Sequence, residues 1–157
     1  MKELNINIKY FNNAKELTIN PNGNWIDVYA NEDVTLRAFD HALIPLGFAM
    51  KLPEGYEAYL APRSSTYKNW GIIIANSIGI IDTSYCGDED EWKLSVICLN
   101  PKEYTSSYVD EERVTRIHKG DKIAQFRIIE SMPIIKFNPV ESLEGKSRGG
   151  FGTTGKV

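Results

Sequence analysis

Residues 75–87 read ANSIGIIDTSYCG, and the rest of the chain is interpreted outward from this stretch. Its β-branched apolar run, 78–81, is bounded by turn-forming residues, which is typical of a short strand. The run ends in one carboxylate, Asp82, and an aromatic ring, Tyr85, follows three residues later. An ionised carboxylate is not buried without a partner, so we expect Asp82 at a strand end, facing water or a ligand.

Short apolar runs of the same kind recur along the whole chain. Several alternate apolar with polar residues, as in NINI at 5–8, and turn signals such as PEG at 53–55 separate them. No strand–helix alternation of the kind that indicates a Rossmann or P-loop nucleotide fold is present in the sequence. The pattern predicts an all-β fold, a sandwich, jelly roll or small barrel. We expect strands within 4–11, 25–30, 34–39, 42–52, 56–61, 71–76, 92–100, 122–129 and 132–137.

Length, composition and charge limit the possible functions. The 157 residues, 42% hydrophobic and 25% charged, suit one domain with a real core. A net charge of −3 argues against electrostatic capture of nucleic acid or a membrane surface. The N-terminus lacks the apolar core of a signal peptide, and no apolar run approaches the roughly 18 residues of a membrane span. We therefore expect a cytoplasmic protein.

Cysteine and histidine are too sparse for the common metal and nucleophile sites. The spacing of Cys86 and Cys98 matches no metal-ligand pattern, so we expect reduced thiols. Two histidines, His41 and His118, are few for a zinc site or a Ser-His-Asp triad. Each histidine is interpreted as a surface residue.

One short helix is expected at residues 64–70. Ser64 or Ser65 can cap its first turn and Gly71 can end its last. Free backbone N–H groups at its start, beside the Arg63 guanidinium, would form a cradle for an anion such as phosphate. A capped surface turn with a solvated arginine fits the same residues equally well.

The C-terminal residues 146–157 read KSRGGFGTTGKV and differ in composition from the rest of the chain. A frayed terminus is the default for a glycine-rich tail. The alternative is a mobile lid, in which Arg148 supplies charge and Phe151 closes over an apolar ring. We divide the chain into a β domain, 1–145, and this flexible segment.

Five motifs, taken together, resemble those of the trimeric dUTPase family, the all-β dUTP nucleotidohydrolases, in the form found in some bacteria and their phages. Each motif alone is a weak pattern, but their order over most of the chain is specific. They are WIDVYA at 25–30, APRSSTYKNWG at 61–71, NSIGIIDTSYCG at 76–87, KGDKIAQ at 119–125 and RGGFGTTG at 148–155. The resemblance implies a distorted jelly roll of the β-clip type and hydrolysis of dUTP to dUMP and pyrophosphate.

The resemblance also implies a role for each residue of the third motif. Asp82 would be the general base that activates water for attack on the α-phosphorus, and carboxylates are ionised near neutral pH. Tyr85 would pack under the deoxyribose and exclude a 2′-hydroxyl. Asn76 and main-chain groups, Gly79 and Ile81 among them, would read uracil.

The remaining motifs would hold the triphosphate. Mg²⁺ is implied, bound chiefly by the phosphates and water, with Asp27 nearby through water or as a structural anchor. The family forms homotrimers in which three subunits share each active site and the tail crosses to a neighbour. The implied phosphate and lid contacts are Arg63, Ser64, Ser65, Gln125, Arg148, Phe151, Gly152 and Thr153. Alone, Gln125 would be interpreted as a solvent-facing residue of an alternating strand.

The fifth motif departs from the family pattern. Its arginine usually stands five residues before the phenylalanine, whereas Arg148 stands three before Phe151 and Lys146 occupies the fifth place. Which of the two cations would meet the γ-phosphate therefore stays open.

Two further segments differ from the family. Four acids, DEDE at 88–91, stand where the family has one Glu or Gln, and we expect them to point to solvent or a subunit boundary. The polar connection 100–116 is longer than usual and is expected as a surface loop, with Tyr104 and Tyr108 as candidate partner contacts. These surfaces allow a second role in binding a regulatory protein. A dCTP deaminase of the same fold is the alternative enzyme, and Tyr85 with the fifth motif argues against it.

Overall fold

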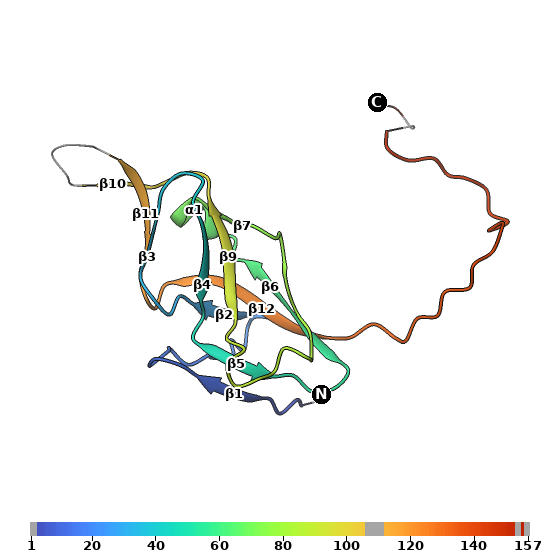
Figure 1. Cartoon of the computed structure of the whole chain (residues 1–157), viewed down its shortest axis with the longest axis horizontal. Coiled ribbons are helices and arrows are strands. Elements are labelled where there is room, and N and C mark those ends of the chain that lie inside the picture. Colours follow the sequence, from blue (N-terminus) through green and yellow to red (C-terminus); the bar gives the residue numbers. More distant parts are fainter. Residues whose placement is uncertain (1–2, 106–111, 153–154, 156–157) are drawn as a thin grey trace.

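The fold is almost entirely antiparallel β-structure, as Figure 1 shows. The structure, a computed structural model, describes residues 3–105, 112–152 and 155. These residues form twelve strands and one short helix, so the predicted all-β class is confirmed. No helix in the described part of the chain has the length and hydrophobicity of a membrane span.

Four sheets make up the domain. The largest has the order β2 (Ile26–Tyr29), β12 (Lys122–Glu130), β6 (Tyr56–Pro62) and β8 (Gly79–Ile81). A second has β4 (His41–Pro45), β9 (Lys93–Cys98) and β7 (Ile72–Ile74). A third has β10 (Glu103–Tyr104), β11 (Arg113–Ile117) and β3 (Val34–Leu36), and β1 (Asn7–Tyr10) pairs with β5 (Phe48–Lys51). The helix, α1 (Thr66–Trp70), lies between β6 and β7.

Alternating side chains of these strands meet in one core. Three fully buried aromatic rings lie at its centre, with Trp92 centroid distances of 5.0 Å to Phe48 and 5.1 Å to Phe126. The even-numbered residues of β9 are buried between partly or fully exposed neighbours, as the sequence alternation predicts. The core therefore joins strands from different sheets around a tryptophan that follows the acidic segment 88–91.

Two expected elements differ from the structure. The run 42–52 is two strands, because the chain turns at Gly47, where φ is +80° and a side chain would collide with Ala14. The connection 100–116 is not wholly a loop, since β10 and β11 pair across its base. Tyr104 on β10 is exposed, and Tyr108 lies outside the described residues.

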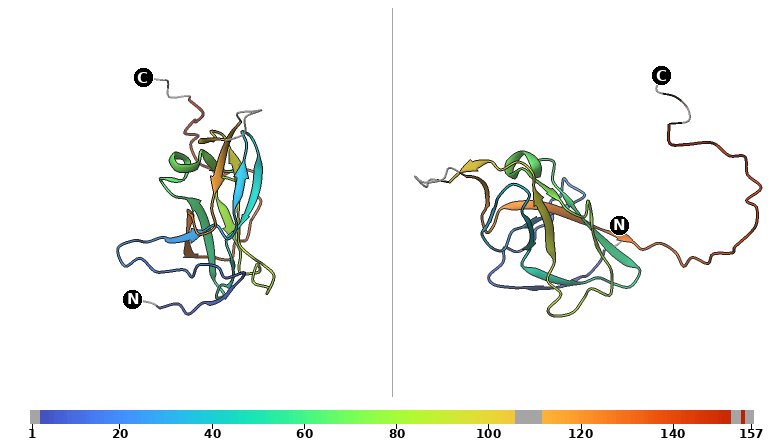
Figure 2. Two further views of the ribbon diagram at one scale, coloured as in Figure 1. Left: turned by 90° about the vertical axis from the view of Figure 1, so that its left-hand side faces the viewer. Right: turned by 45° about the horizontal axis from the view of Figure 1, so that its top comes forward.

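The strand expected at 132–137 does not form. Residues 131–145 follow β12 without helix or strand and lead away from the sheets, as the right-hand view of Figure 2 shows. Their large side chains are exposed, with Ile134 and Phe137 at 102% and 88%. An apolar run can form a strand only beside another strand, and the described part of the chain supplies none here.

Replacing Gly71 with alanine is expected to destabilise the domain by at least about 2 kcal/mol. Gly71 ends α1 with φ at +64°, and an added Cβ would overlap the backbone oxygen of Asn100. The Gly71 oxygen also accepts hydrogen bonds from the backbone N–H groups of Leu99 and Asn100. Chemical denaturation measures the loss. The matched control is Gly120→Ala, because Gly120 also has a positive φ, +92°, but open space around it. Equal losses in the two variants would contradict the steric account.

Candidate active site

Three of the five motifs meet at one cleft. Gln125 of β12 pairs with Asp27 of β2 on one side and with Ala61 of β6 on the other, and Arg63 follows the end of β6. The cleft has a volume of about 340 Å³. It is lined by Asn20, Gly23, Asn24, Trp25, Asp27, Arg63, Ser64 and Gln125. Arg63, Ser64 and Gln125 thus line the same cleft, and their expected role as phosphate contacts stays a prediction.

A network of three charges organises this cleft. Arg63 Nε lies 2.8 Å from Asp27 Oδ1, and Lys122 Nζ lies 3.1 Å from Asp27 Oδ2. Both carboxylate oxygens are thus engaged, and the two cations leave a net positive charge beside the cleft. Because Asp27 binds Nε, the terminal guanidinium nitrogens of Arg63 can donate to an anion. This geometry favours Asp27 as a structural anchor.

A buried threonine fixes the turn that presents Arg63. The Arg63 backbone N–H donates to Thr66 Oγ1 over 2.8 Å, and the Thr66 hydroxyl donates to the Ile123 oxygen over 2.9 Å. The expected serine cap was wrong: α1 begins at Thr66, and Ser65 at its N-cap position makes no side-chain capping bond. The Ser65 hydroxyl instead accepts a long hydrogen bond, 3.3 Å, from Arg63 Nη1. Thr66 therefore links the second motif to β12.

The sequence analysis did not identify Trp25, which lines the cleft, or Lys122, which contacts Asp27 beside it, and it did not predict the hydrogen bond that orients Gln125. Lys122 stands in the fourth motif, but nothing in the sequence pairs it with Asp27 across β2 and β12. Trp25 lines the cleft under the guanidinium of Arg127, 5.8 Å from the ring centroid. Gln125 donates from Nε2 to the Pro62 oxygen over 3.0 Å, which orients its amide.

The third motif lies at the other end of β6. Gly79 pairs with Leu60 and Ile81 with Ala58, so Asp82 follows β8 level with Glu57, near the start of β6. Arg63 follows Pro62 at the opposite end, six residues beyond Glu57, or about 20 Å along the strand. Asp82 does not line the cleft. It is exposed as expected, and its carboxylate has no hydrogen bond or ion pair within the described residues.

The turn before β8 holds the residues expected to read a base. Asn76 is exposed, and the Ile78 N–H donates to its backbone oxygen over 2.7 Å. Ser77 takes a positive φ of +63° in this turn. Gly79 is required for strand contact, because a Cβ there would lie 2.9 Å from the Leu60 Cβ. Asn76, Gly79, Ile81 and Asp82 therefore lie on one short, tightly held segment.

Two hydrogen bonds hold Tyr85, one to Asp82 and one to Glu91. Its backbone N–H donates to the Asp82 oxygen over 3.1 Å, and its hydroxyl donates to the Glu91 backbone oxygen over 2.9 Å. The ring is 39% exposed. Burial raises the pKa of Tyr85, and the charges of Asp90 and Glu91 raise it further. The hydroxyl therefore stays protonated and remains a donor at neutral pH.

The fifth-motif residues reach neither part of this site. Arg148, Phe151 and Gly152 line a hollow formed by the tail itself, and Phe151 is fully exposed. The tail lies away from the sheets in Figure 1. Thr153 lies outside the described residues. One chain thus presents a charged cleft, a third-motif segment and a tail as three separate parts.

Comparison with known proteins identifies the family of the chain. The dUTPase family model matches residues 20–155. The chain is 44% identical over 153 residues to the SPbeta prophage-derived deoxyuridine 5′-triphosphate nucleotidohydrolase YosS of Bacillus subtilis, covering 97% of this chain and 99% of that protein. It is 37% identical over 143 residues to the deoxyuridine 5′-triphosphate nucleotidohydrolase of Finegoldia magna, covering 90% of each.

Solved structures share the fold. A Staphylococcus bacteriophage 80alpha dUTPase mutant with dUpNHpp has a TM-score of 0.78 at 23% identity, covering 96% of this chain and 98% of that one. A dUTPase mutant from phage phi11 of S. aureus, described with a structural Mg(II) ion, has a TM-score of 0.74 at 21% identity, covering 90% and 100%. The resemblance inferred from the five motifs is confirmed, and the chain belongs to the dUTPase family of nucleotide hydrolases.

Proposed function

We propose that this chain hydrolyses dUTP to dUMP and pyrophosphate, with Asp82 as the general base. The observation that carries the proposal is the exposed Asp82 carboxylate, free of described partners and one turn from Tyr85, in a chain of this family. A carboxylate without a competing partner can accept a hydrogen bond from water. General-base catalysis of this kind contributes about 10²- to 10⁴-fold in rate.

The chemical step follows from the position of Asp82. Its carboxylate takes a proton from water as the water oxygen attacks the α-phosphorus. The bond between the α-phosphorus and the α,β-bridging oxygen breaks, and that oxygen leaves with pyrophosphate. The water oxygen remains on dUMP, and the proton passes from Asp82 to solvent. No covalent enzyme intermediate is needed.

Selection of the nucleoside is assigned to the rest of the segment. Asn76 and the main chain at Gly79 and Ile81 form a narrow, held edge that suits the donor and acceptor pattern of uracil. The Tyr85 ring would face the sugar, and its bulk would clash with a 2′-hydroxyl. Cytosine would be rejected by its reversed hydrogen-bonding pattern and thymine by its methyl group.

The charged cleft is assigned to the phosphates. Arg63, Ser64, Ser65 and Gln125 supply donors around a positively charged centre. Among the described residues, no group of three or more His, Cys, Asp or Glu side chains could hold a metal, and Arg63 and Lys122 engage both oxygens of Asp27. We therefore propose that the substrate is Mg–dUTP, in which the phosphates and water supply most of the Mg²⁺ ligands. Bound Mg²⁺ neutralises charge that develops on the leaving pyrophosphate.

The complete site is proposed to form between the subunits of a homotrimer. A single chain separates Asp82 from Arg63 by the length of β6, which supports pairing of each half with a neighbour. Exposed apolar surface supports the same assembly, since such surface is normally covered. It lies on the outer sheet face at Leu43 and Ile73 and on the segment 131–145, at Met132, Ile134, Ile135, Phe137, Val140 and Leu143.

The tail is assigned as a lid that closes over a neighbouring site. Residues 146–157 form this lid beside the domain 1–145, with Phe151 over the base and Arg148 or Lys146 at the γ-phosphate. The exposure of Phe151 and Arg148 in the single chain supports the assignment. We place the activity in the cytoplasm, where the free Cys86 and Cys98 stay reduced.

Pyrophosphate release from dUTP, dCTP, dTTP and UTP, each with Mg²⁺, tests the proposed function. Turnover is expected with dUTP and not with the other three. No turnover of dUTP would overturn the proposal, and ammonia release from dCTP would support the deaminase alternative.

A chain ending at Glu144 is expected to lose most of its kcat for dUTP, because the lid is removed. An unchanged kcat would mean that the tail is merely frayed. The second role, in binding a regulatory protein, stays a prediction.

A further inference from the structure

The acidic segment after Tyr85 is folded back on itself. We call residues 87–91, GDEDE, the bracket. Asp88 and Glu89 are exposed, as the sequence suggests, but Asp90 and Glu91 are half-buried and turned inward. Asp88 and Glu89 therefore face solvent, and the expectation that all four acids point to solvent or a subunit boundary stays a prediction for Asp90 and Glu91.

A carboxylate closes the bracket. Asp90 Oδ2 accepts a 2.7 Å hydrogen bond from the Gly87 N–H, and the Asp90 N–H donates to the Gly87 oxygen over 3.1 Å. The Glu91 N–H donates to the Glu89 oxygen over 2.9 Å. Gly87 permits this closure, because a Cβ there would lie 2.9 Å from Asp90 Oδ2. The bond from Gly87 to a charged acceptor is stronger than an ordinary backbone hydrogen bond.

The closed bracket carries the acceptor for Tyr85. The Tyr85 hydroxyl donates to the backbone oxygen of Glu91, the residue next to Asp90. The raised pKa of Tyr85 keeps this donor protonated. A change in the path of the chain between Gly87 and Glu91 would therefore move the oxygen that holds the ring.

The far end of the bracket is anchored in the core. The N–H of the fully buried Trp92 donates to the Phe48 oxygen, and the Leu46 N–H donates to the Trp92 oxygen, both over 2.9 Å. Burial raises the pKa of the Glu91 carboxyl, the Glu32 charge adds to this shift, and the Lys93 charge and the Gly47 backbone oppose it. The two hydrogen bonds of Trp92 therefore fix the backbone next to the Glu91 oxygen.

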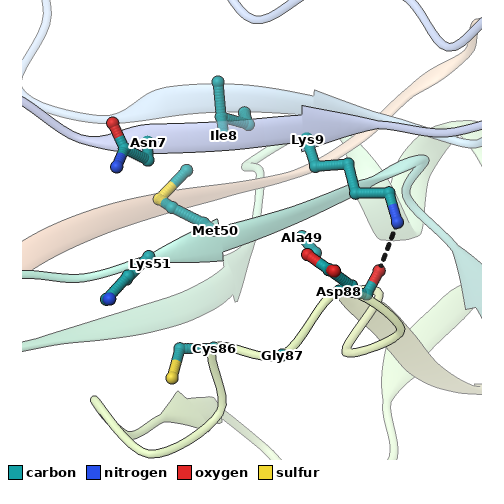
Figure 3. Close-up of a pocket in the computed structure, with 9 residues that line it drawn as sticks. All are labelled: Asn7, Ile8, Lys9, Ala49, Met50, Lys51, Cys86, Gly87 and Asp88. Carbon is teal, nitrogen blue, oxygen red and sulfur yellow. Dashed lines mark hydrogen bonds between the residues drawn. The ribbon is translucent and has the colours of Figure 1, made fainter.

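The near side of the bracket has little packing. Figure 3 shows a cavity of about 250 Å³ between the β1–β5 pair and residues 86–88. Lys9 crosses its edge and donates from Nζ to the Asp88 backbone oxygen over 2.9 Å. Lys9 also lies 3.8 Å from a Glu89 carboxylate oxygen, and these two Lys9 contacts reach the bracket from β1 across the cavity. The internal bonds between Gly87 and Asp90 supply the other restraints on the path of the chain there.

We propose that Asp90 is a positioning residue, which fixes the Tyr85 ring through the bracket and so sets the preference for deoxyribose over ribose. The inference rests on the function proposed above, in which Tyr85 meets the sugar. A ring tethered at its hydroxyl rejects a 2′-hydroxyl by a clash that it cannot relieve by moving. A ring freed from its tether can shift and admit the ribonucleotide.

The test compares kcat/KM for dUTP with kcat/KM for UTP in purified variants. Asp90→Ala is expected to lower this ratio roughly tenfold, mainly through better use of UTP, with kcat for dUTP near the wild-type value. Asp90→Asn is expected to restore most of the ratio, because its amide oxygen can accept the Gly87 hydrogen bond. Tyr85→Phe keeps the ring without the tether and should lower the ratio by a similar factor. The double variant should add little to either change.

Asp88→Ala is the matched control, because it removes one carboxylate from the same loop. The Asp88 side chain has no hydrogen bond or ion pair in the described part of the chain. The ratio of kcat/KM for dUTP to kcat/KM for UTP in Asp88→Ala should therefore equal that of the wild type. An unchanged ratio in Asp90→Ala, an equal change in Asp88→Ala, or no rescue by Asp90→Asn would overturn the proposal. Each of these results requires a wild-type chain that hydrolyses dUTP. Failure of that hydrolysis would instead count against the proposed function.

Discussion

Asp82→Asn is expected to lower kcat for dUTP by about 10²- to 10⁴-fold while dUTP binds at least as tightly as to the wild type. The amide keeps the size of the carboxylate but cannot take a proton from water. Its neutrality removes one negative charge near an anionic substrate, so binding has no electrostatic reason to weaken. Single-turnover pyrophosphate release measures the rate, and calorimetric titration with dUTP measures the affinity.

Asp88→Asn is the control for this prediction. It makes the same chemical change six residues further along the chain, on an exposed side chain without a described partner, and should leave kcat unchanged. Near-normal turnover by Asp82→Asn would show that the general base is misassigned. A loss of affinity in step with the loss of rate would show instead that Asp82 binds substrate and does not activate water.

The strands could be predicted because each is specified locally. Alternation along 93–98 identifies one buried face of that strand, and the apolar run ending at Ile81 predicts both β8 and the exposure of Asp82. The run 132–137 has the same local signals and yet forms no strand. A strand also needs a second strand to pair with, and the local pattern of apolar residues does not predict whether one lies beside it.

The candidate site was harder to predict where it depends on register. Pairing of Gln125 with both Asp27 and Ala61 brings three motifs together, but register is set by contacts between distant segments. The ion pair of Asp27 with Lys122 follows from the same register. The inward turn of Asp90 could not be expected either, because a run of acids is ordinarily solvated and only its hydrogen bond with Gly87 turns it inward.

Mixing two inactive variants is expected to restore activity if sites are shared between subunits. Asp82→Asn lacks the base, and Arg63→Ala lacks the guanidinium of the phosphate cleft, so each alone should be nearly inactive. In mixed trimers a site is complete when its Asp82 comes from an Arg63→Ala chain and its Arg63 comes from an Asp82→Asn chain. When equal amounts of the two variants assort at random, a site receives an intact Asp82 with a probability of about one in two, and an intact Arg63 with the same probability. About a quarter of the sites should therefore be complete.

Co-refolding the two variants and measuring pyrophosphate release per site gives the result. The control mixes Asp82→Asn with the double variant Asp82→Asn/Arg63→Ala, which can form no complete site in any arrangement. The separation of Asp82 and Arg63 along β6 is the structural reason to expect recovery, because both side chains must reach the same substrate. Recovery no greater than in the control would mean that each chain assembles its own site. The tail and the segment 131–145 would then have to fold back onto the same subunit.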